Sequence, residues 1–430
     1  MKRAVAVLLC AVLATGSITS CQSKKSETAA SSSVKEEKET KTDKDNENEK
    51  DDTSKNDSKG AENTENQENV STDIKTDTKS EGDESENTDA ENDDMKDDLT
   101  MQKLRENGSS IDYTSLEEIN LEAGSHIAVV VKSTKNGFWT SVKRGMDAAV
   151  ADLNEKLGYK GEDKIKLTFE GPSDETDVED QINIIDAVLG ENPDVLCLSA
   201  IDMDSCQAQL EAAEENGIPV IVLDSGVKTG NVNATCVVDN YQAGVQAAVK
   251  LADTIGGSGK IAVMTHVESA QNCQEREQGF TETIAEKYPD IEIVNISHQN
   301  EETSVSEMAE SVLKLFPDVK GYFCTNENVS GDVLDAISAS GKEVAVVGID
   351  AGKKQKDAIK SGKEVGVLVQ NAYGMGYATV VAAARAALGL ENDESINPGM
   401  EWIDSENYFV DHGINHKLGI LLYGDPGTGK

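Results

Sequence analysis

A continuous apolar run followed by a polar loop gives the clearest indication of the fold: residues 127–139 read IAVVVKSTKNGFW. The first five residues are β-branched or small, as in a strand that is covered on both faces of its sheet. A polar loop then leads into a helical pattern that begins near Trp139. A strand, a loop and a helix in this order form the first half of a β-α-β unit.

The same pattern recurs along the chain. Strands are expected at residues 127–131, 165–169, 195–198, 220–223, 261–264, 291–296, 321–324, 344–349 and 365–369, with amphipathic helical stretches between them. Strict alternation gives parallel strands with right-handed crossovers, so it predicts an α/β protein with doubly wound parallel sheets. Nine or more strands in about 290 residues are too many for one small lobe, and we therefore expect two lobes of about 130 residues each.

Polar side chains follow these strands at their carboxyl ends, where open parallel sheets bind ligands. The residues expected to surround a ligand are Ser133, Asn136, Phe138, Trp139, Asp224, Ser225, Arg276, Asn326, Asp350 and Gln370. Their planar polar groups can engage two neighbouring hydroxyls, and the aromatic rings can cover the C–H face of a sugar. Helix caps, a surface ion pair and core packing are the alternative interpretations of these residues. Their shared place after strands, in both halves of the chain, favours a small-molecule site.

The first 21 residues have the layout of an export signal. Lys2 and Arg3 precede an apolar run, residues 4–14, that is too short to span a bilayer stably. Residues 18–21, Ile-Thr-Ser-Cys, resemble a bacterial lipobox, in which the cysteine is lipidated and becomes the new N-terminus. We therefore expect Cys21 to anchor the protein on the extracytoplasmic face of the cell membrane.

Residues 22–110 are predicted to be a disordered acidic tether. Residues 22–100 hold 26 acidic and 12 basic side chains, and too few apolar ones to offset the entropy of ordering. The chain from residue 101 onward is acidic too, with a net charge of −28. This charge argues against nucleic acid as a partner and against direct contact with an anionic lipid surface.

Several chemical functions are not expected. The five cysteines between residues 197 and 324 show no C-x-x-C spacing, so neither a disulfide framework nor a metal site is predicted. No nucleophile motif or cofactor motif stands out, and the chain is interpreted as a binding protein without a cofactor rather than an enzyme.

Residues 424–430, GDPGTGK, match a phosphate loop but lack the Ser or Thr and the helix that should follow it. Residues 416–430 are left as an unexplained tail.

The loops after the strands resemble those of the ribose-binding type of periplasmic binding proteins, the sugar-binding subunits of ABC importers. The similar segments are residues 133–139, 218–224, 276–280, 326–327, 346–350 and 370, and the resemblance spans about residues 125–412. It implies a type I periplasmic binding protein, whose two lobes close on a ligand about a three-crossing hinge. The implied lobes are residues 125–238 with 371–398 and residues 239–370 with 399–415, with crossings near 238–240, 370–371 and 397–402.

The sequence departs from this family at two places. Ser225 stands where ribose binders carry Arg, and residues 299–301 lack the aromatic ring that closes the second face of the sugar. Galactose, inositol, a modified sugar and a furanosyl signalling molecule therefore stay open as ligands.

The resemblance implies a monomeric lipoprotein that captures a monosaccharide or polyol and delivers it to an ABC permease. One alternative is a receptor that serves a sensor kinase or a chemoreceptor. Another is an extracellular enzyme acting on sugars, with Asp224 and Asp350 as its acid–base pair.

Overall fold

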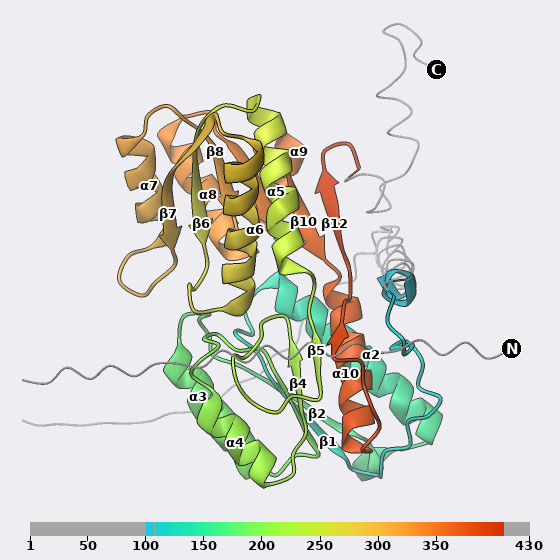
Figure 1. The fold of residues 1–430 in the computed structure, drawn as a ribbon. Helices are drawn as coiled ribbons and strands as arrows, with labels where there is room; N and C mark the ends of the chain where they lie inside the picture. The colour runs from blue at the N-terminus through green and yellow to red at the C-terminus, as the bar shows by residue number, and fades with distance from the viewer. Residues whose placement is uncertain (1–99, 107, 408–430) are drawn as a thin grey trace, which may run out of the picture. The chain divides into compact units, whose positions relative to one another are not determined.

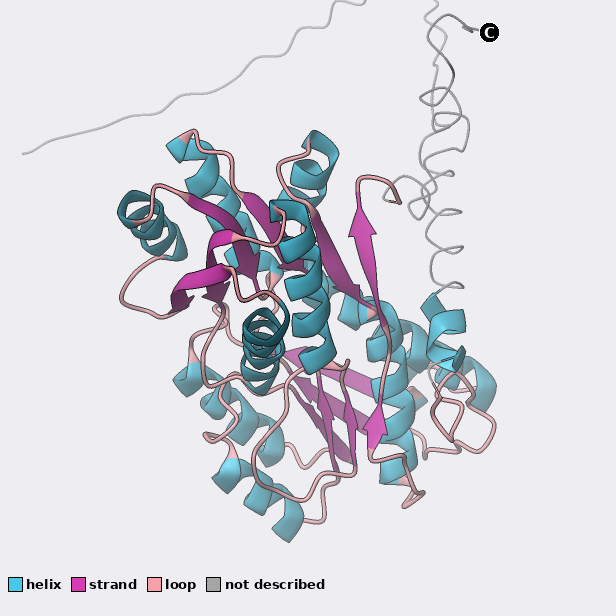
Figure 2. Cartoon of the chain, turned by 45° about the horizontal axis from the view of Figure 1, so that its top comes forward, coloured by secondary structure: helices cyan, strands magenta, loops and turns pink. Residues whose placement is uncertain are grey.

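The computed structural model describes residues 100–106 and 108–407 of the 430-residue chain. In this part of the chain, two six-stranded sheets are each covered by helices on both faces (Figures 1 and 2). The predicted export signal, Cys21, most of the predicted tether and the tail at 416–430 lie outside the described residues.

The first sheet belongs to the lobe that begins the fold. Its strands are β1 (His126–Val130), β2 (Lys166–Glu170), β3 (Val195–Leu198), β4 (Val220–Leu223), β5 (Ala234–Cys236) and β11 (Ser395–Ile396), in the order β11-β5-β4-β3-β1-β2. All neighbouring pairs of strands run parallel. Because side chains alternate along a strand, Ile127 and Val129 face the core under α2 (Gly137–Leu157) and α10 (Ala372–Ala387). Ala128 and Val130 face the core under α3 (Val178–Gly190) and α4 (Gln207–Glu215).

The second sheet repeats this plan. Its strands are β6 (Gly259–Thr265), β7 (Ile291–His298), β8 (Val319–Cys324), β9 (Ala345–Ile349), β10 (Gly366–Gln370) and β12 (Met400–Asp404), in the order β12-β10-β9-β8-β6-β7. Four neighbouring pairs are parallel, and the edge strand β12 runs antiparallel to β10. Helices α5 (Asn240–Ile255) and α6 (Gln271–Lys287) cover one face. On the other face pack α7 (Val305–Leu315) and α8 (Glu327–Ser340), and α9 (Lys353–Ser361) lies next to α8.

The chain passes between the two lobes three times. The crossings lie at residues 237–239 between β5 and α5, at Asn371 between β10 and α10, and at residues 397–399 between β11 and β12. The side chain of Asn371 ties two of them together: its Oδ1 caps α10 by accepting from Gly374 N, and its Nδ2 donates to the Pro398 carbonyl at 3.0 Å. The predicted fold class, two doubly wound lobes joined by a three-crossing hinge, is confirmed.

The prediction of a disordered segment up to residue 110 is wrong at its C-terminal end. Residues 100–106 are helical, and Leu104 is buried together with Tyr113 and Ile119 in the core of the first lobe. Asn371 Nδ2 also donates to the Thr100 carbonyl at 2.9 Å. Sparse apolar residues suffice to order this segment because the folded lobe already offers them a surface to pack against.

Candidate functional site

A small cavity lies where the carboxyl ends of the strands of both lobes meet. It is lined by Lys132, Asn136, Phe138, Trp139, Glu175, Asp224, His266, Asn272, Arg276, Asn326, Glu327, Asp350 and Gln370. Its volume is about 20 Å³, which is room for about one water molecule. The two lobes are therefore closed on each other at this site.

Eight of the ten predicted site residues line this cavity: Asn136, Phe138, Trp139, Asp224, Arg276, Asn326, Asp350 and Gln370. Ser133 and Ser225 are buried but do not line it. The Ser133 hydroxyl accepts a hydrogen bond from Lys135 N within its own loop, and the Ser225 hydroxyl has no partner among the described residues. That these ten residues bind a ligand stays a prediction.

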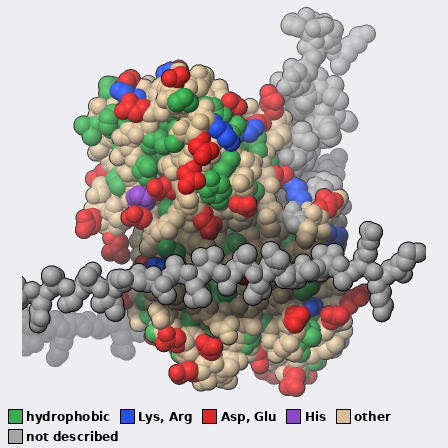
Figure 3. Space-filling view, in the orientation of Figure 1, with side chains coloured by type: hydrophobic (Ala, Val, Ile, Leu, Met, Phe, Trp, Pro, Cys, Tyr) green, Lys and Arg blue, Asp and Glu red, His purple; other side chains and the backbone are tan. Residues whose placement is uncertain are grey.

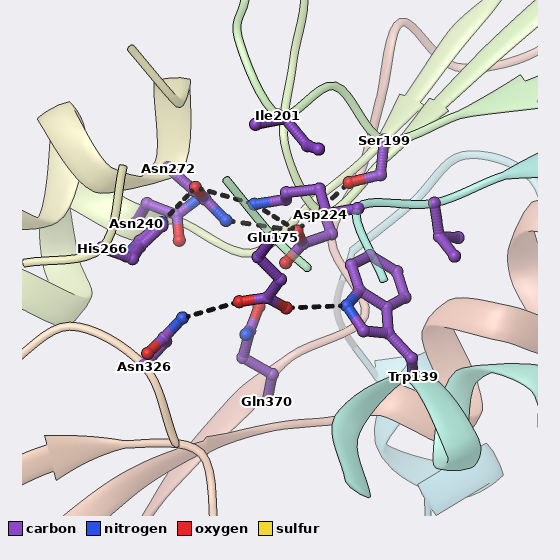
Figure 4. A network of polar contacts seen from close by, with 12 residues as sticks. Trp139, Glu175, Ser199, Ile201, Asp224, Asn240, His266, Asn272, Asn326 and Gln370 are labelled. Carbon is purple, nitrogen blue, oxygen red and sulfur yellow. Dashed lines mark hydrogen bonds and ion pairs between the residues drawn. The ribbon is translucent and has the colours of Figure 1, made fainter. Parts of the chain in front are cut away.

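A buried ion pair of the first lobe lies on one side of the cavity and is hydrogen-bonded by the second lobe. Lys132 Nζ, at the end of β1, lies 3.0 Å from Asp224 Oδ2, at the end of β4. Asn272 reaches both from α6 of the second lobe: its Oδ1 accepts from Lys132 at 3.2 Å and its Nδ2 donates to Asp224 at 3.2 Å (Figure 4). Ser199 also donates to Asp224, at 3.3 Å. A buried ion pair needs such extra hydrogen bonds to offset the desolvation of both charges.

The backbone at two strand ends is unusual and explains how two acids reach the site. Asp224 has φ +58° and Asp350 has φ +66°, in the left-handed region that side chains other than glycine rarely adopt. Both directly follow a buried strand, and this backbone conformation turns the chain sharply there. Strained residues of this kind cluster at ligand-binding sites.

Arg276 is held in place by its own helix packing. Helix α6 can approach α5 closely because Gly279 has no side chain. A Cβ at this position would lie 2.1 Å from the Tyr241 carbonyl oxygen. This contact brings Arg276 Nε to 2.8 Å from Asn240 Oδ1, while Nη1 donates to the Thr325 carbonyl at 2.7 Å. Arg276 Nη2 is buried and has no partner in the part of the chain that the structure describes.

Asp350 and Gln370 form a second polar pair. Gln370 Nε2 donates to Asp350 Oδ1 at 2.9 Å, and Gln370 Oε1 is a buried acceptor without a partner in residues 100–106 and 108–407. Burial raises the pKa of Asp350 to about 7, against the opposing influence of the Arg276 guanidinium. Asp350 can therefore exist as an acid or as a carboxylate near neutral pH.

His266 is buried and neutral. Burial, together with the nearby charges of Lys132 and Arg276, holds its pKa well below the usual range. Its Nε2 lies 2.9 Å from Asn272 Oδ1, which can only accept, so Nε2 carries the proton. Its Nδ1 then accepts from the Thr325 hydroxyl at 2.8 Å, and this ring positions Asn272 for the ion pair.

Two glutamates close the opposite side of the cavity. Glu175, in the loop between β2 and α3, accepts from Asn136 and Trp139 of its own lobe and from Asn326 and Asn328 of the second lobe. Figure 4 shows its carboxylate between Trp139 and Asn326. Glu327 Oε1 accepts from the Gly137 backbone N–H across the lobes at 2.9 Å, and burial raises the pKa of Glu327.

The sequence prediction missed five lining residues: Lys132, Glu175, His266, Asn272 and Glu327. A signal existed for four of them. Lys132 and His266 follow β1 and β6 within two residues, Glu327 follows Asn326, and Asn272 lies one helical turn before Arg276. Glu175 lies in the loop after β2, and no candidate was chosen there, as none was chosen after β3 or β7.

Three further observations concern metal ligands, membrane spans and cysteines among the described residues. Among residues 100–106 and 108–407, no group of three or more His, Cys, Asp or Glu side chains is placed to hold a metal ion. None of the helices formed by these residues is long and apolar enough to cross a membrane. The cysteines at 197, 206, 236, 273 and 324 are buried free thiols.

Two parallel-sheet lobes, a three-crossing hinge and a polar cavity enclosed by both lobes define a type I periplasmic binding protein. The family model described as "Periplasmic binding protein domain" matches residues 127–391. The chain therefore belongs to this family, and the relatives given below confirm its ribose-binding type.

Curated proteins and solved structures with similar chains are known. The ribose import binding protein RbsB of Bacillus subtilis is 27% identical over 237 residues, 55% of this chain and 73% of that protein. The D-apiose import binding protein of Actinobacillus succinogenes is 28% identical over 242 residues, 56% of this chain and 74% of that protein. A carbohydrate transporter solute binding protein from Agrobacterium radiobacter, in complex with D-arabinose, aligns with a TM-score of 0.61 and 26% identity, covering 66% of this chain and 96% of that one. An ABC transporter solute binding protein from Agrobacterium vitis with bound D-fucose aligns with a TM-score of 0.60 and 27% identity over the same shares.

Proposed function

We propose that this protein captures a neutral monosaccharide or polyol by closure of its two lobes and delivers it to an ABC importer, without catalysing a reaction. The observation that carries the proposal is the pair of unpartnered buried groups in the cavity, the donor Arg276 Nη2 and the acceptor Gln370 Oε1. A hydroxyl group both accepts and donates, so neighbouring hydroxyls of one ligand can satisfy both. A ligand without such groups would leave them unpaired, at about 1–3 kcal/mol each.

The aromatic residues support a sugar among polyhydroxy ligands. Phe138 and Trp139 line the cavity, and their ring centroids lie 4.9 Å apart with the ring planes at 78°. A ring held in this way offers a rigid apolar surface to the C–H face of a pyranose or furanose. The names of the relatives, which include ribose and D-apiose import binding proteins, point to the same ligand class.

The surface charge supports a ligand without negative charge. Acidic side chains are spread over both lobes in the face that Figure 3 shows. The whole chain carries a formal net charge of −40. A field of this sign lowers the local concentration of anions near the site and has little effect on neutral sugars.

The remaining parts of the proposal concern the surroundings of this domain. We propose that Cys21 is lipidated on the extracytoplasmic face of the membrane and that the acidic segment after it holds the lobes away from the bilayer. We propose lobe limits at 125–238 with 371–398 and at 239–370 with 399–415. The membership of the strands in the two sheets supports this division within the described residues, where the first lobe extends back to residue 100. The closed form of a monomer would be the state that the permease recognises.

Titration calorimetry of the purified protein against neutral monosaccharides and polyols tests this function. We expect one of them to bind, and the Gln370→Ala variant to bind it about tenfold or more weakly, since about 1.4 kcal/mol is lost per tenfold change in Kd. Asn407→Ala, on the strand-end turn after β12 and away from the cavity, serves as the control and should bind like the wild type. Binding of amino acids or nucleosides in place of every sugar and polyol would refute the proposal.

A further inference from the structure

The Glu175 carboxylate is the most heavily hydrogen-bonded group in the cavity described above. Its Oε1 accepts from Asn136 Nδ2 at 2.9 Å and from Trp139 Nε1 at 3.0 Å. Its Oε2 accepts from Asn326 Nδ2 at 3.1 Å and from Asn328 Nδ2 at 3.2 Å. A carboxylate has about four lone-pair positions, so these four N–H donors use its capacity and leave none for a ligand.

The four donors form a cage that only acceptors can fill. The indole nitrogen of Trp139 donates and cannot accept. The amides of Asn136 and Asn326 are fixed in orientation, because their Oδ1 atoms cap α2 and α8 by accepting from Trp139 N and Val329 N. Their Nδ2 atoms must therefore point into the cavity. Three of the four donors are residues predicted from the sequence to bind the ligand.

The cavity has no room for a sugar while Glu175 stays in place. Its volume of about 20 Å³ holds about one water molecule, and a monosaccharide is several times larger. Other polar side chains that line the cavity are held by hydrogen bonds within the second lobe. Arg276 is held by Asn240 and the Thr325 carbonyl, and Asn272 is held by His266. Glu175 instead lies on the loop at residues 171–177, outside any helix or strand.

A solvent-exposed groove next to this loop offers space for the Glu175 side chain when a ligand displaces it. Thr176, the next residue, lines a groove of about 740 Å³ that opens to solvent and is otherwise formed by the second lobe. Two consecutive residues of this loop thus line the closed cavity and the open groove, Glu175 and Thr176 respectively. A change in the loop would carry the Glu175 carboxylate from the cage into water, where the charge is hydrated.

We propose that Glu175 is an internal competitor of the ligand: its carboxylate fills the donor cage in the ligand-free closed protein, and two neighbouring hydroxyl oxygens of the sugar replace it. This inference rests on the proposed function, because it concerns the ligand of the same site. Glu175 therefore lowers the affinity for every ligand and selects those with two adjacent acceptor oxygens at this end. The acidic surroundings favour hydroxyl oxygens over a ligand carboxylate as the replacing pair.

Two variants test the competition by calorimetry with the neutral sugar or polyol that the wild type binds most tightly. Glu175→Ala empties the cage, and its Kd should fall about tenfold. Asn328→Ala loosens Glu175 without changing the cavity wall, since Asn328 donates to Glu175 and does not line the cavity; its Kd should fall by a smaller factor. Glu179→Ala removes an exposed acidic side chain from the first turn of α3 and controls for charge alone, so it should leave Kd unchanged.

The results separate the possible failures. An unchanged or weaker affinity in Glu175→Ala, in a protein whose thermal midpoint shows that it is folded, overturns the inference and assigns Glu175 as a direct ligand contact or as a bystander. Tighter binding of D-gluconate or D-galacturonate than of any neutral sugar overturns the hydroxyl assignment. If no sugar, polyol or sugar acid binds either the wild type or Glu175→Ala, the proposed function itself fails.

Discussion

Glu364 offers a test of how burial sets the pH dependence of stability. It lies between α9 and β10, is 2% exposed, and one of its oxygens, Oε2, has no hydrogen-bond partner among the described residues. Gln355 Nε2 donates to its other oxygen at 3.4 Å. Burial raises the pKa of Glu364 from 4.5 to about 8, and the hydrogen bond from Gln355 opposes this shift only in part. At neutral pH the folded protein therefore holds Glu364 protonated.

The sign and size of the effect follow from proton linkage. Between pH 4.5 and about 8 the folded state binds one proton at Glu364 that the unfolded state has released. The free energy of unfolding must then fall as pH rises through this window, by up to about 1.4 kcal/mol per pH unit from this group. The Glu364→Gln variant cannot titrate here and is close in shape, so its stability should fall less steeply over the same range.

Urea unfolding at pH 5, 6, 7 and 8 measures the difference. The free-energy gap between Glu364→Gln and the wild type should shift in favour of the variant as pH rises, by an amount on the order of a few kcal/mol over the whole window. Glu343→Gln, an exposed neighbour on the loop before β9, is the matched control and should keep the wild-type slope. Parallel curves for Glu364→Gln and the wild type would mean that Glu364 does not hold a proton in the folded state.

Three further variants test how the site is positioned. Gly279→Ala should destabilise the protein by about 1–3 kcal/mol in urea unfolding. The reason is that the new Cβ would lie 2.1 Å from the Tyr241 carbonyl oxygen and push α6 away from α5. Unchanged stability would refute this tight packing. Lys132→Met leaves Asp224 buried without its cation, so the free energy of unfolding should fall by about 3–5 kcal/mol. A fall below about 1 kcal/mol would show that Asp224 is hydrated. Asn371→Ala removes the α10 cap and the tie to Pro398 at the hinge, so it should lower stability by about 1 kcal/mol or more. Small-angle scattering should also find its ligand-free form more open, and a scattering curve equal to that of the wild type would contradict this role.

The strands that the sequence predicted are those with a continuous apolar run. β3 and β4 begin and end at the predicted residues, because four buried apolar side chains in succession are a strong signal for a central parallel strand. β5, β11 and β12 were missed for the opposite reason. β5 and β11 have three and two residues, and β12 is an antiparallel edge strand with mostly half-buried side chains. Their position depends on pairing partners that are distant in sequence, such as Thr235 for Ser395.

The site was predictable as far as strand ends determine it. Asp224, Asp350 and Gln370 were found because each stands at the end of a buried strand or directly after it. Ser225 shows where this rule fails: the left-handed backbone of Asp224 turns the chain, so the next side chain is buried without lining the cavity. Glu175 could not be chosen by the rule either, because it lies five residues beyond the end of β2 and reaches the site only through the folding of its loop.

Asn326 was open to two interpretations from the sequence, as a helix cap or as a ligand-binding residue. The structure shows, at Asn326 and also at Asn136, that capping and facing the site do not exclude each other. An asparagine amide separates its acceptor from its donors, so its oxygen can hold a helix N-terminus while its nitrogen faces outward. Asn136 does this at the start of α2 and Asn326 at the start of α8, one in each lobe. The cap fixes the amide orientation that the cavity needs. The same local requirement that starts a helix after a strand therefore also places a donor at the point where the two lobes meet, which explains why the cavity lies at helix N-termini of both lobes.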